Sequence, residues 1–149
     1  MTELTGNEVL LLVDDEPAVR RLLRLSLEPR GYRIVEAGDG LEALERLEEC
    51  GAVDLALLDL SMPRLGGVEA LRAMRSRQPD LAAIFMSGHP EPPSLATAPA
   101  DVPFLAKPFQ PDELAEQVRS ALEKRRRLSE GAAPQTEIQG NPAAARGNG

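Results

Sequence analysis

Short aliphatic runs alternate along the chain with segments whose apolar residues recur every three or four positions. Such runs are typical of strands buried on both faces of a sheet, and the wider spacing is typical of amphipathic helices. We predict five strands, at residues 8–13, 32–37, 54–60, 81–86 and 102–105. Helices are predicted after each of the first three strands and, from Pro111, after the last. This alternation predicts an α/β fold with a parallel sheet covered by helices on both faces.

The connection between the fourth and fifth strands breaks the pattern. Pro90, Pro92, Pro93 and Pro99 fall where a fourth helix is expected. A proline inside a helix costs about 3 kcal/mol, so only one or two turns around residues 94–98 are compatible with these prolines. We therefore predict an irregular connection with a shortened fourth helix.

The length of 149 residues predicts one domain with a packed core. We predict that residues 8–128 form this domain, after an N-terminal extension of residues 1–7. Residues 129–149 are mostly small or polar, and Ile138 is their only large aliphatic residue. Because such a segment cannot build a hydrophobic face, we predict a disordered C-terminal tail.

Charge and cysteine content narrow the possible partners and surroundings. The formal net charge of −7 argues against binding to nucleic acids or anionic membranes, and no aliphatic run is long enough to cross a bilayer. We interpret the basic run at 124–127 as a solvated helix end. The single cysteine, Cys50, excludes a disulfide within the chain, and we interpret it as a small packing residue. No secretory signal is visible, and these features together predict a cytoplasmic protein.

Polar residues gather where the predicted strands end. Asp14 and Asp15 follow the first strand, Asp59 lies near the end of the third, Ser87 follows the fourth and Lys107 follows the fifth. The carboxyl ends of parallel strands meet at one edge of the sheet, where ligands bind in this class of fold. Three converging carboxylates repel one another unless a cation lies among them. Oxygen donors without His or Cys favour a hard cation such as Mg²⁺.

Lys107 extends this interpretation, because the chain has only two lysines among its 17 basic residues. A lysine at this place indicates a site that needs a compact positive charge. Carboxylates, a metal, a hydroxyl and an ammonium group together describe a pocket for a phosphoryl group. Phosphoryl transfer requires positioning and charge neutralisation, and these groups supply both.

Four short motifs stand in order at the predicted strand ends: Asp14-Asp15, Asp59 with Met62-Pro63 and Gly67, Ser87-Gly88, and Lys107-Pro108-Phe109. On these residues, the chain resembles the receiver domains of two-component signalling over about residues 8–128. The resemblance implies a flavodoxin-like, three-layer fold with five parallel strands in the order 2-1-3-4-5.

The resemblance also implies a chemistry for the pocket. Asp59 would accept a phosphoryl group from a phosphohistidine of a sensor histidine kinase or a histidine phosphotransfer protein. Asp15, and Asp14 largely through water, would hold Mg²⁺ together with the Asp59 carboxylate and the backbone carbonyl of Ser61. Such a domain catalyses only its own phosphorylation and dephosphorylation, so we do not expect an enzyme that acts on a separate substrate.

Further roles follow from the same resemblance. Lys107 would contact the phosphoryl oxygens, and Ser87 would close over them. Phe104 matches the aromatic switch position of the family, which turns inward when Ser87 moves. The Lys107–Pro108 peptide bond would be cis, a conformation accessible to bonds that precede proline.

Two features distinguish this chain within the family pattern. Ser61, two residues after Asp59, and His89, two residues after Ser87, occupy positions at which family members tune the lifetime of the phosphoryl group. The proline-rich stretch at 90–103 replaces the regular fourth helix, which is part of the face that receivers often use for dimers or output partners.

These observations leave two classes of function open. The first is a stand-alone, phosphorylatable receiver whose output comes through protein–protein contact or further phosphotransfer, because only the predicted tail follows the last helix. The second is an interaction module with the receiver fold that acts without phosphorylation, which the altered fourth helix would suit. An aspartyl-nucleophile phosphatase is set aside, because it would need a second acid where Ser61 stands.

Overall fold

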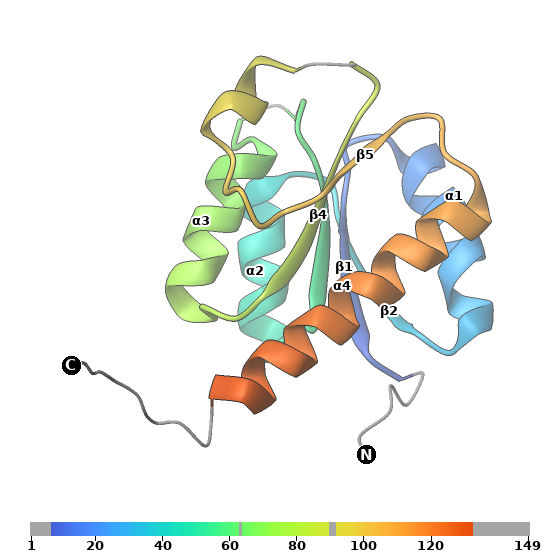
Figure 1. Cartoon of the computed structure of the whole chain (residues 1–149). Coiled ribbons are helices and arrows are strands. Elements are labelled where there is room, and N and C mark those ends of the chain that lie inside the picture. The colour runs from blue at the N-terminus through green and yellow to red at the C-terminus, as the bar shows by residue number, and fades with distance from the viewer. Residues whose placement is uncertain (1–6, 63, 90–91, 133–149) are drawn as a thin grey trace.

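Five parallel strands form one sheet in the order β2-β1-β3-β4-β5, as predicted (Figure 1). The computed structural model describes residues 7–62, 64–89 and 92–132. The strands are β1 (Val9–Val13), β2 (Arg33–Ala37), β3 (Leu55–Asp59), β4 (Ala82–Ser87) and β5 (Phe104–Ala106). The α-helices are α1 (Pro17–Leu27), α2 (Gly40–Cys50), α3 (Gly67–Arg77) and α4 (Pro111–Ala132), and two 3-10 helices are η1 (Glu28–Arg30) and η2 (Pro93–Thr97).

The sheet is the middle of three layers, with α2 and α3 on one face and α1 and α4 on the other (Figure 1). Successive side chains of a strand point to opposite faces. Leu11 and Val13 of β1 therefore pack toward α2 and α3, whereas Leu10 and Leu12 pack toward α1 and α4. The half-buried ring of Tyr32 lies against the α1/α4 core. The apolar strand residues thus divide between two separate hydrophobic cores, one on each face of the sheet, which confirms the predicted three-layer fold.

The connection from β4 to β5 contains η2 in place of a full helix, as the prolines predict. Residues 90 and 91 lie outside the described part of the chain. Leu95 of η2 packs against the α2/α3 core. Arg72 donates a hydrogen bond of 2.8 Å to the last carbonyl of η2, and Arg75 forms an ion pair of 2.9 Å with Asp101. Two arginines of α3 thus fasten this irregular connection.

Two helical side chains differ from their predicted environments. Leu41, Leu44 and Leu47 recur at helical spacing in the sequence, which predicts that they form one apolar stripe of α2, but 49% of Leu41 is exposed. The buried stripe instead includes Ala43 and Leu47, and Leu41 precedes Ala43 by two residues, which is about 200° around the helix. The prediction that Cys50 is a packing residue is wrong, because Cys50 is exposed. It is the last residue of α2, and the chain turns away at Gly51 with a φ of 84°.

Arg125 belongs to the basic run that we interpret from the sequence as a solvated helix end, but its side chain contacts other parts of the protein. Its guanidinium donates to the Asp54 carboxylate at 2.9 Å and to the Asp80 carboxylate at 3.3 Å. It also donates to the main-chain carbonyls of both aspartates, at 3.2 and 3.0 Å. Arg125 therefore ties α4 to the segments that precede β3 and β4.

We expect the Arg125→Gln variant to lose about 1–2 kcal/mol of unfolding free energy. The ion pairs are partly exposed and contribute little, but two main-chain carbonyls lose a charged hydrogen-bond donor. Urea unfolding measures this loss. The control is Arg127→Gln, two residues later on an exposed position, which should change stability by less than about 0.5 kcal/mol. An equal loss of unfolding free energy in the two variants would contradict the conclusion that Arg125 stabilises the packing of α4 against the segments before β3 and β4.

The described residues include the end of α4 at Ala132, four positions beyond the predicted domain boundary. Residues 1–6 of the predicted extension and 133–149 of the predicted tail lie outside them. Among the helices of the described ranges, none is both long and apolar enough to span a membrane.

Candidate phosphoryl and metal site

The loop after β1 places two carboxylates at the carboxyl edge of the sheet. Asp14 is fully buried, and both of its carboxylate oxygens have partners. Oδ1 accepts a hydrogen bond of 2.9 Å from the backbone N–H of Glu16, and Oδ2 accepts one of 2.7 Å from Nζ of Lys107. The backbone N–H of Asp14 also donates to the carbonyl of Ala37 on β2. Asp14 is therefore fixed, while the carboxylate of Asp15 is exposed.

Asp59 is the last residue of β3, and only 4% of it is exposed. Its Oδ1 accepts a hydrogen bond of 3.1 Å from the backbone N–H of Ser61, and its Oδ2 lies 3.6 Å from Nζ of Lys107. The main chain of Asp59 lies directly against the start of α3. A Cβ atom at Gly67 would be 2.6 Å from the Asp59 carbonyl oxygen, so only glycine fits there.

Lys107 joins the two buried carboxylates. Its backbone N–H donates to the carbonyl of Ser87 at 2.8 Å, and the peptide bond to Pro108 is cis. Burial lowers the pKa of Lys107, but the hydrogen bond from the ammonium to Asp14 and the charges of Asp14 and Asp59 outweigh it, so the pKa is raised. Lys107 is thus held in its charged form between Asp14 and Asp59.

The pKa of Asp59 is raised from its ordinary value. Burial is the main cause, and the negative charges of Asp14 and Asp15 act in the same direction. The N–H of Ser61 and the charge of Lys107 lower this pKa without cancelling the rise. Three carboxylates face one ammonium group here, so additional positive charge would favour the ionised form of Asp59.

The three carboxylates fit a divalent cation. Oxygen atoms of Asp14, Asp15 and Asp59 lie within 4.8 Å of one another. The donors are all hard oxygens, which suits Mg²⁺. Both Asp14 oxygens already have protein partners, so the exposed Asp15 and the Oδ2 atom of Asp59 are the more available ligands.

The other predicted site residues lie around this cluster. Ser87 ends β4 and is buried, and its hydroxyl accepts a hydrogen bond of 3.0 Å from the backbone N–H of His89. His89 itself is exposed in the following loop. Phe104 begins β5 and packs, half-buried, against the α2/α3 core. Ser61 is exposed beside Asp59. The structure thus brings the three acids and Lys107 together directly, and places Ser87 at the same edge.

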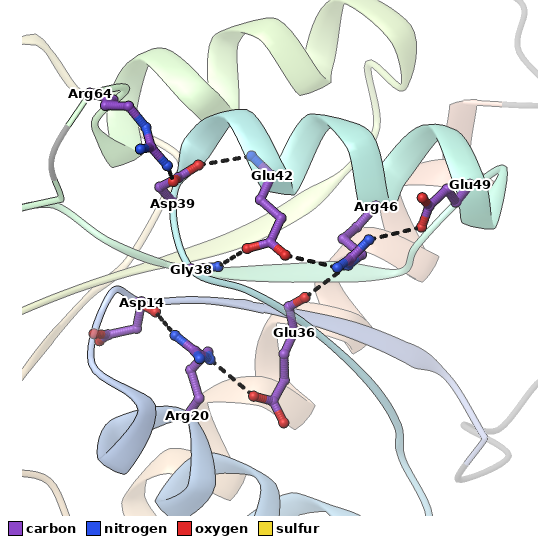
Figure 2. Close-up of polar contacts among 9 residues, drawn as sticks. All are labelled: Asp14, Arg20, Glu36, Gly38, Asp39, Glu42, Arg46, Glu49 and Arg64. Carbon is purple, nitrogen blue, oxygen red and sulfur yellow. Dashed lines mark hydrogen bonds and ion pairs between the residues drawn. The ribbon is translucent and has the colours of Figure 1, made fainter.

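One residue that contacts this site was missed by the sequence analysis. Arg20 of α1 donates from Nη1 to the main-chain carbonyl of Asp14 at 2.5 Å and from Nε to Glu36 of β2 at 3.0 Å (Figure 2). The sequence shows Arg20 only as a polar residue between apolar helix positions. Its spacing of four residues from Arg24, which also contacts Glu36, is the one available signal.

The chain matches one protein family over most of its length. The family model of the response regulator receiver domain matches residues 10–119. The sensor kinase CckA of Brucella abortus (strain 2308) is 44% identical over 126 residues, which are 83% of this chain and 13% of CckA. The response regulator MprA of Mycobacterium leprae (strain TN) is 39% identical over 118 residues, which are 77% of this chain and 51% of MprA. The chain thus spans about half, or less, of the length of these relatives.

Solved structures agree with this match. A CheY-like response regulator receiver domain protein from Methanospirillum hungatei JF-1 has a TM-score of 0.72 and a sequence identity of 27%, and the match covers 82% of this chain and 98% of that one. The order of the five strands and the acidic cluster at their carboxyl edge are consistent with the match. The chain belongs to the response regulator receiver domain family of two-component systems.

Proposed function

We propose that this chain is a phosphorylatable receiver in which Asp59 accepts a phosphoryl group from a phosphohistidine. The observation that carries the proposal is the grouping of Asp59 with Asp14, Asp15 and Lys107 at one edge of the sheet. Four charged side chains from three separate strand ends meet there. A structural role alone does not account for three carboxylates whose mutual repulsion opposes folding.

The proposed reaction is an attack by an Asp59 carboxylate oxygen on the phosphorus atom of the phosphohistidine. The new P–O bond forms as the P–N bond breaks, and the electron pair of that bond goes to the imidazole ring. Lys107 would contact the transferred oxygens, and Ser87 would approach them in the phosphorylated state. Asp15, Asp59 and the carbonyl of Ser61 would hold Mg²⁺, with Asp14 acting largely through water, and the bound ion would neutralise charge on the phosphoryl oxygens.

The partner that supplies the phosphoryl group would be a sensor histidine kinase or a histidine phosphotransfer protein. Family membership supports this class of partner, since the relatives include a sensor kinase and a response regulator. The proposed output is a conformational change read through protein–protein contact, with Phe104 responding to Ser87 and with Ser61 and His89 tuning the phosphoryl lifetime. We also propose a cytoplasmic location, which the single cysteine supports, because a chain without an internal disulfide suits a reducing compartment.

Intact-mass measurement with acetyl phosphate tests the proposal, with and without Mg²⁺. We expect one added phosphoryl group on the wild type that requires Mg²⁺, and none on Asp59→Asn. This variant should be at least as stable as the wild type, because the raised pKa of Asp59 means that its ionised form opposes folding at neutral pH. Asp101→Asn, at an exposed aspartate of the β4–β5 connection, is the matched control and should be phosphorylated like the wild type.

Three results would count against the proposal. An adduct that persists on Asp59→Asn would place the phosphoryl group elsewhere, and an adduct independent of Mg²⁺ would contradict the metal site. No adduct with acetyl phosphate or with any candidate kinase would favour an interaction module that acts without phosphorylation.

A further inference from the structure

A continuous line of polar contacts joins the loop after β1 to the loop after β3 (Figure 2). At its first end, the guanidinium of Arg20 contacts the main-chain carbonyl of Asp14 at 2.5 Å. That carbonyl belongs to the peptide group between Asp14 and Asp15. The contact therefore restrains the one peptide group that carries both acids of the proposed metal site.

Glu36 anchors Arg20 in this position. Its carboxylate accepts hydrogen bonds from Arg20 at 3.0 Å and from Arg24 at 2.7 Å. Burial raises the pKa of Glu36, but the two arginines outweigh burial and lower it, so the anchor stays ionised. The main-chain carbonyl of Glu36 accepts a further hydrogen bond of 3.2 Å from Arg46 of α2.

The line continues along α2 to the second loop. Arg46 pairs with Glu42 at 2.8 Å, and Glu42 accepts a hydrogen bond of 2.6 Å from the backbone N–H of Gly38. The buried carboxylate of Asp39 caps α2 by accepting from the N–H of Glu42, and it also pairs with Arg64 (Figure 2). Arg64 has a φ of 64°, which is a costly conformation for a side chain of this size. The loop that carries Ser61 is thus tied to the same framework.

We propose that Arg20 is a positioning residue that holds the Asp14–Asp15 peptide in the geometry that binds Mg²⁺. This role rests on the proposed metal-dependent function. Asp14 has its own partners, but the exposed carboxylate of Asp15 is oriented mainly by the peptide that precedes it. A charged donor on that carbonyl, itself held by an ionised anchor, reduces the freedom of Asp15 before the ion arrives. Groups that orient metal ligands in this way commonly change metal affinity by about 10–100-fold.

Arg24 supplies a matched control within the same helix. Like Arg20 it pairs with Glu36, and it also pairs with Glu28, but it makes no contact with Asp14. Arg24→Gln therefore removes at least as many ion pairs as Arg20→Gln. If metal affinity followed general stability, Arg24→Gln would weaken binding at least as strongly. If metal affinity depends on the hydrogen bond to the Asp14 carbonyl, only Arg20→Gln will weaken Mg²⁺ binding.

The test is isothermal titration of Mg²⁺ into the unphosphorylated chain, with urea unfolding of each variant in parallel. We expect Arg20→Gln to weaken Mg²⁺ binding about tenfold or more, and Arg24→Gln to leave it within about twofold. Arg20→Lys should recover part of the affinity, because a lysine can reach the Asp14 carbonyl but cannot bridge to Glu36 with a planar fork. It also provides a second variant in case the glutamine variant folds poorly.

Asp15→Asn separates the failure of this inference from failure of the proposed function. Suppose that Asp15→Asn loses Mg²⁺ binding but Arg20→Gln binds Mg²⁺ with the affinity of the wild type. This result would overturn the positioning role of Arg20 and leave the phosphorylatable receiver intact. Equal weakening by Arg20→Gln and Arg24→Gln would also overturn it, because the effect would then be general. Absence of Mg²⁺ binding to the wild type would overturn both proposals.

Discussion

The Gly67→Ser variant should lose about 2–3 kcal/mol of unfolding free energy and bind Mg²⁺ more weakly than the wild type. A Cβ atom at this position would be 2.6 Å from the carbonyl oxygen of Asp59 and 3.2 Å from its carbonyl carbon. Both are backbone atoms, so α3 or the end of β3 has to move, and such overpacking is costly. The movement falls on Asp59, so stability and metal binding should decline together.

Gly66→Ser places the same side chain one residue earlier and serves as the control. Its Cβ atom would lie 2.9 Å from Oε1 of Glu69, at the end of a flexible side chain that can move away. The nearest backbone atom, the carbonyl oxygen of Leu60, would be 3.7 Å away, which is an ordinary van der Waals distance. Gly66 is the N-cap of α3, and the helix has no side-chain cap in the wild type. Serine at the N-cap with Glu69 three residues later forms a capping box, which should raise stability by a few tenths of a kcal/mol. Similar urea midpoints for the two variants would contradict this account of the clash.

Lys107→Met should lower the unfolding free energy by about 3 kcal/mol when no Mg²⁺ is present. Methionine preserves much of the length of the side chain but removes the charge. The fully buried Asp14 carboxylate then loses its hydrogen bond of 2.7 Å, and Asp59 loses the nearby positive charge. Breaking a buried ion pair by removing one partner is costly because the remaining charge is uncompensated.

Mg²⁺ should restore part of this loss. A ligand that binds only the folded state stabilises it, and the metal would bring positive charge to the same three carboxylates. Thermal unfolding with increasing Mg²⁺ should therefore show a larger rise in Tm for Lys107→Met than for the wild type. Lys124→Met, at the other lysine of the chain and on an exposed position, should behave like the wild type. A Tm of Lys107→Met that does not respond to Mg²⁺ would contradict shared neutralisation of the carboxylates.

Sequence patterns were sufficient for the fold because the inner strands β1, β3 and β4 of the doubly covered parallel sheet are almost uniformly apolar. Leu55 to Leu58 illustrate this, since all four are fully buried although they face two different cores. The prolines between β4 and β5 were equally informative, because a covalent constraint on the backbone does not depend on distant contacts. Helical faces were less predictable. The spacing of Leu41 matches a helix, but the face that becomes buried depends on where the helix lies on the sheet.

The acidic cluster could be predicted because the ends of parallel strands converge whatever the details of packing. Lys107 and Asp14 are 93 residues apart, and their side chains meet at the carboxyl edge, where the sequence places both residues. Long side chains that reach between elements do not obey such a rule. Arg20 and Arg125 each find partners through a reach and direction that only the packed structure defines.

The two hydrophobic cores differ in whether intrinsic fluorescence can monitor their unfolding. The chain has one tyrosine and no tryptophan, and Tyr32 packs against the α1/α4 core alone. Its fluorescence therefore follows that core and carries no direct signal from the residues under α2 and α3. Circular dichroism averages over all helices, so coincident transitions by the two methods would indicate that both cores melt as one unit. Separate transitions would identify the α2/α3 layer, which supports the loop after β3, as an independently unfolding part of the domain.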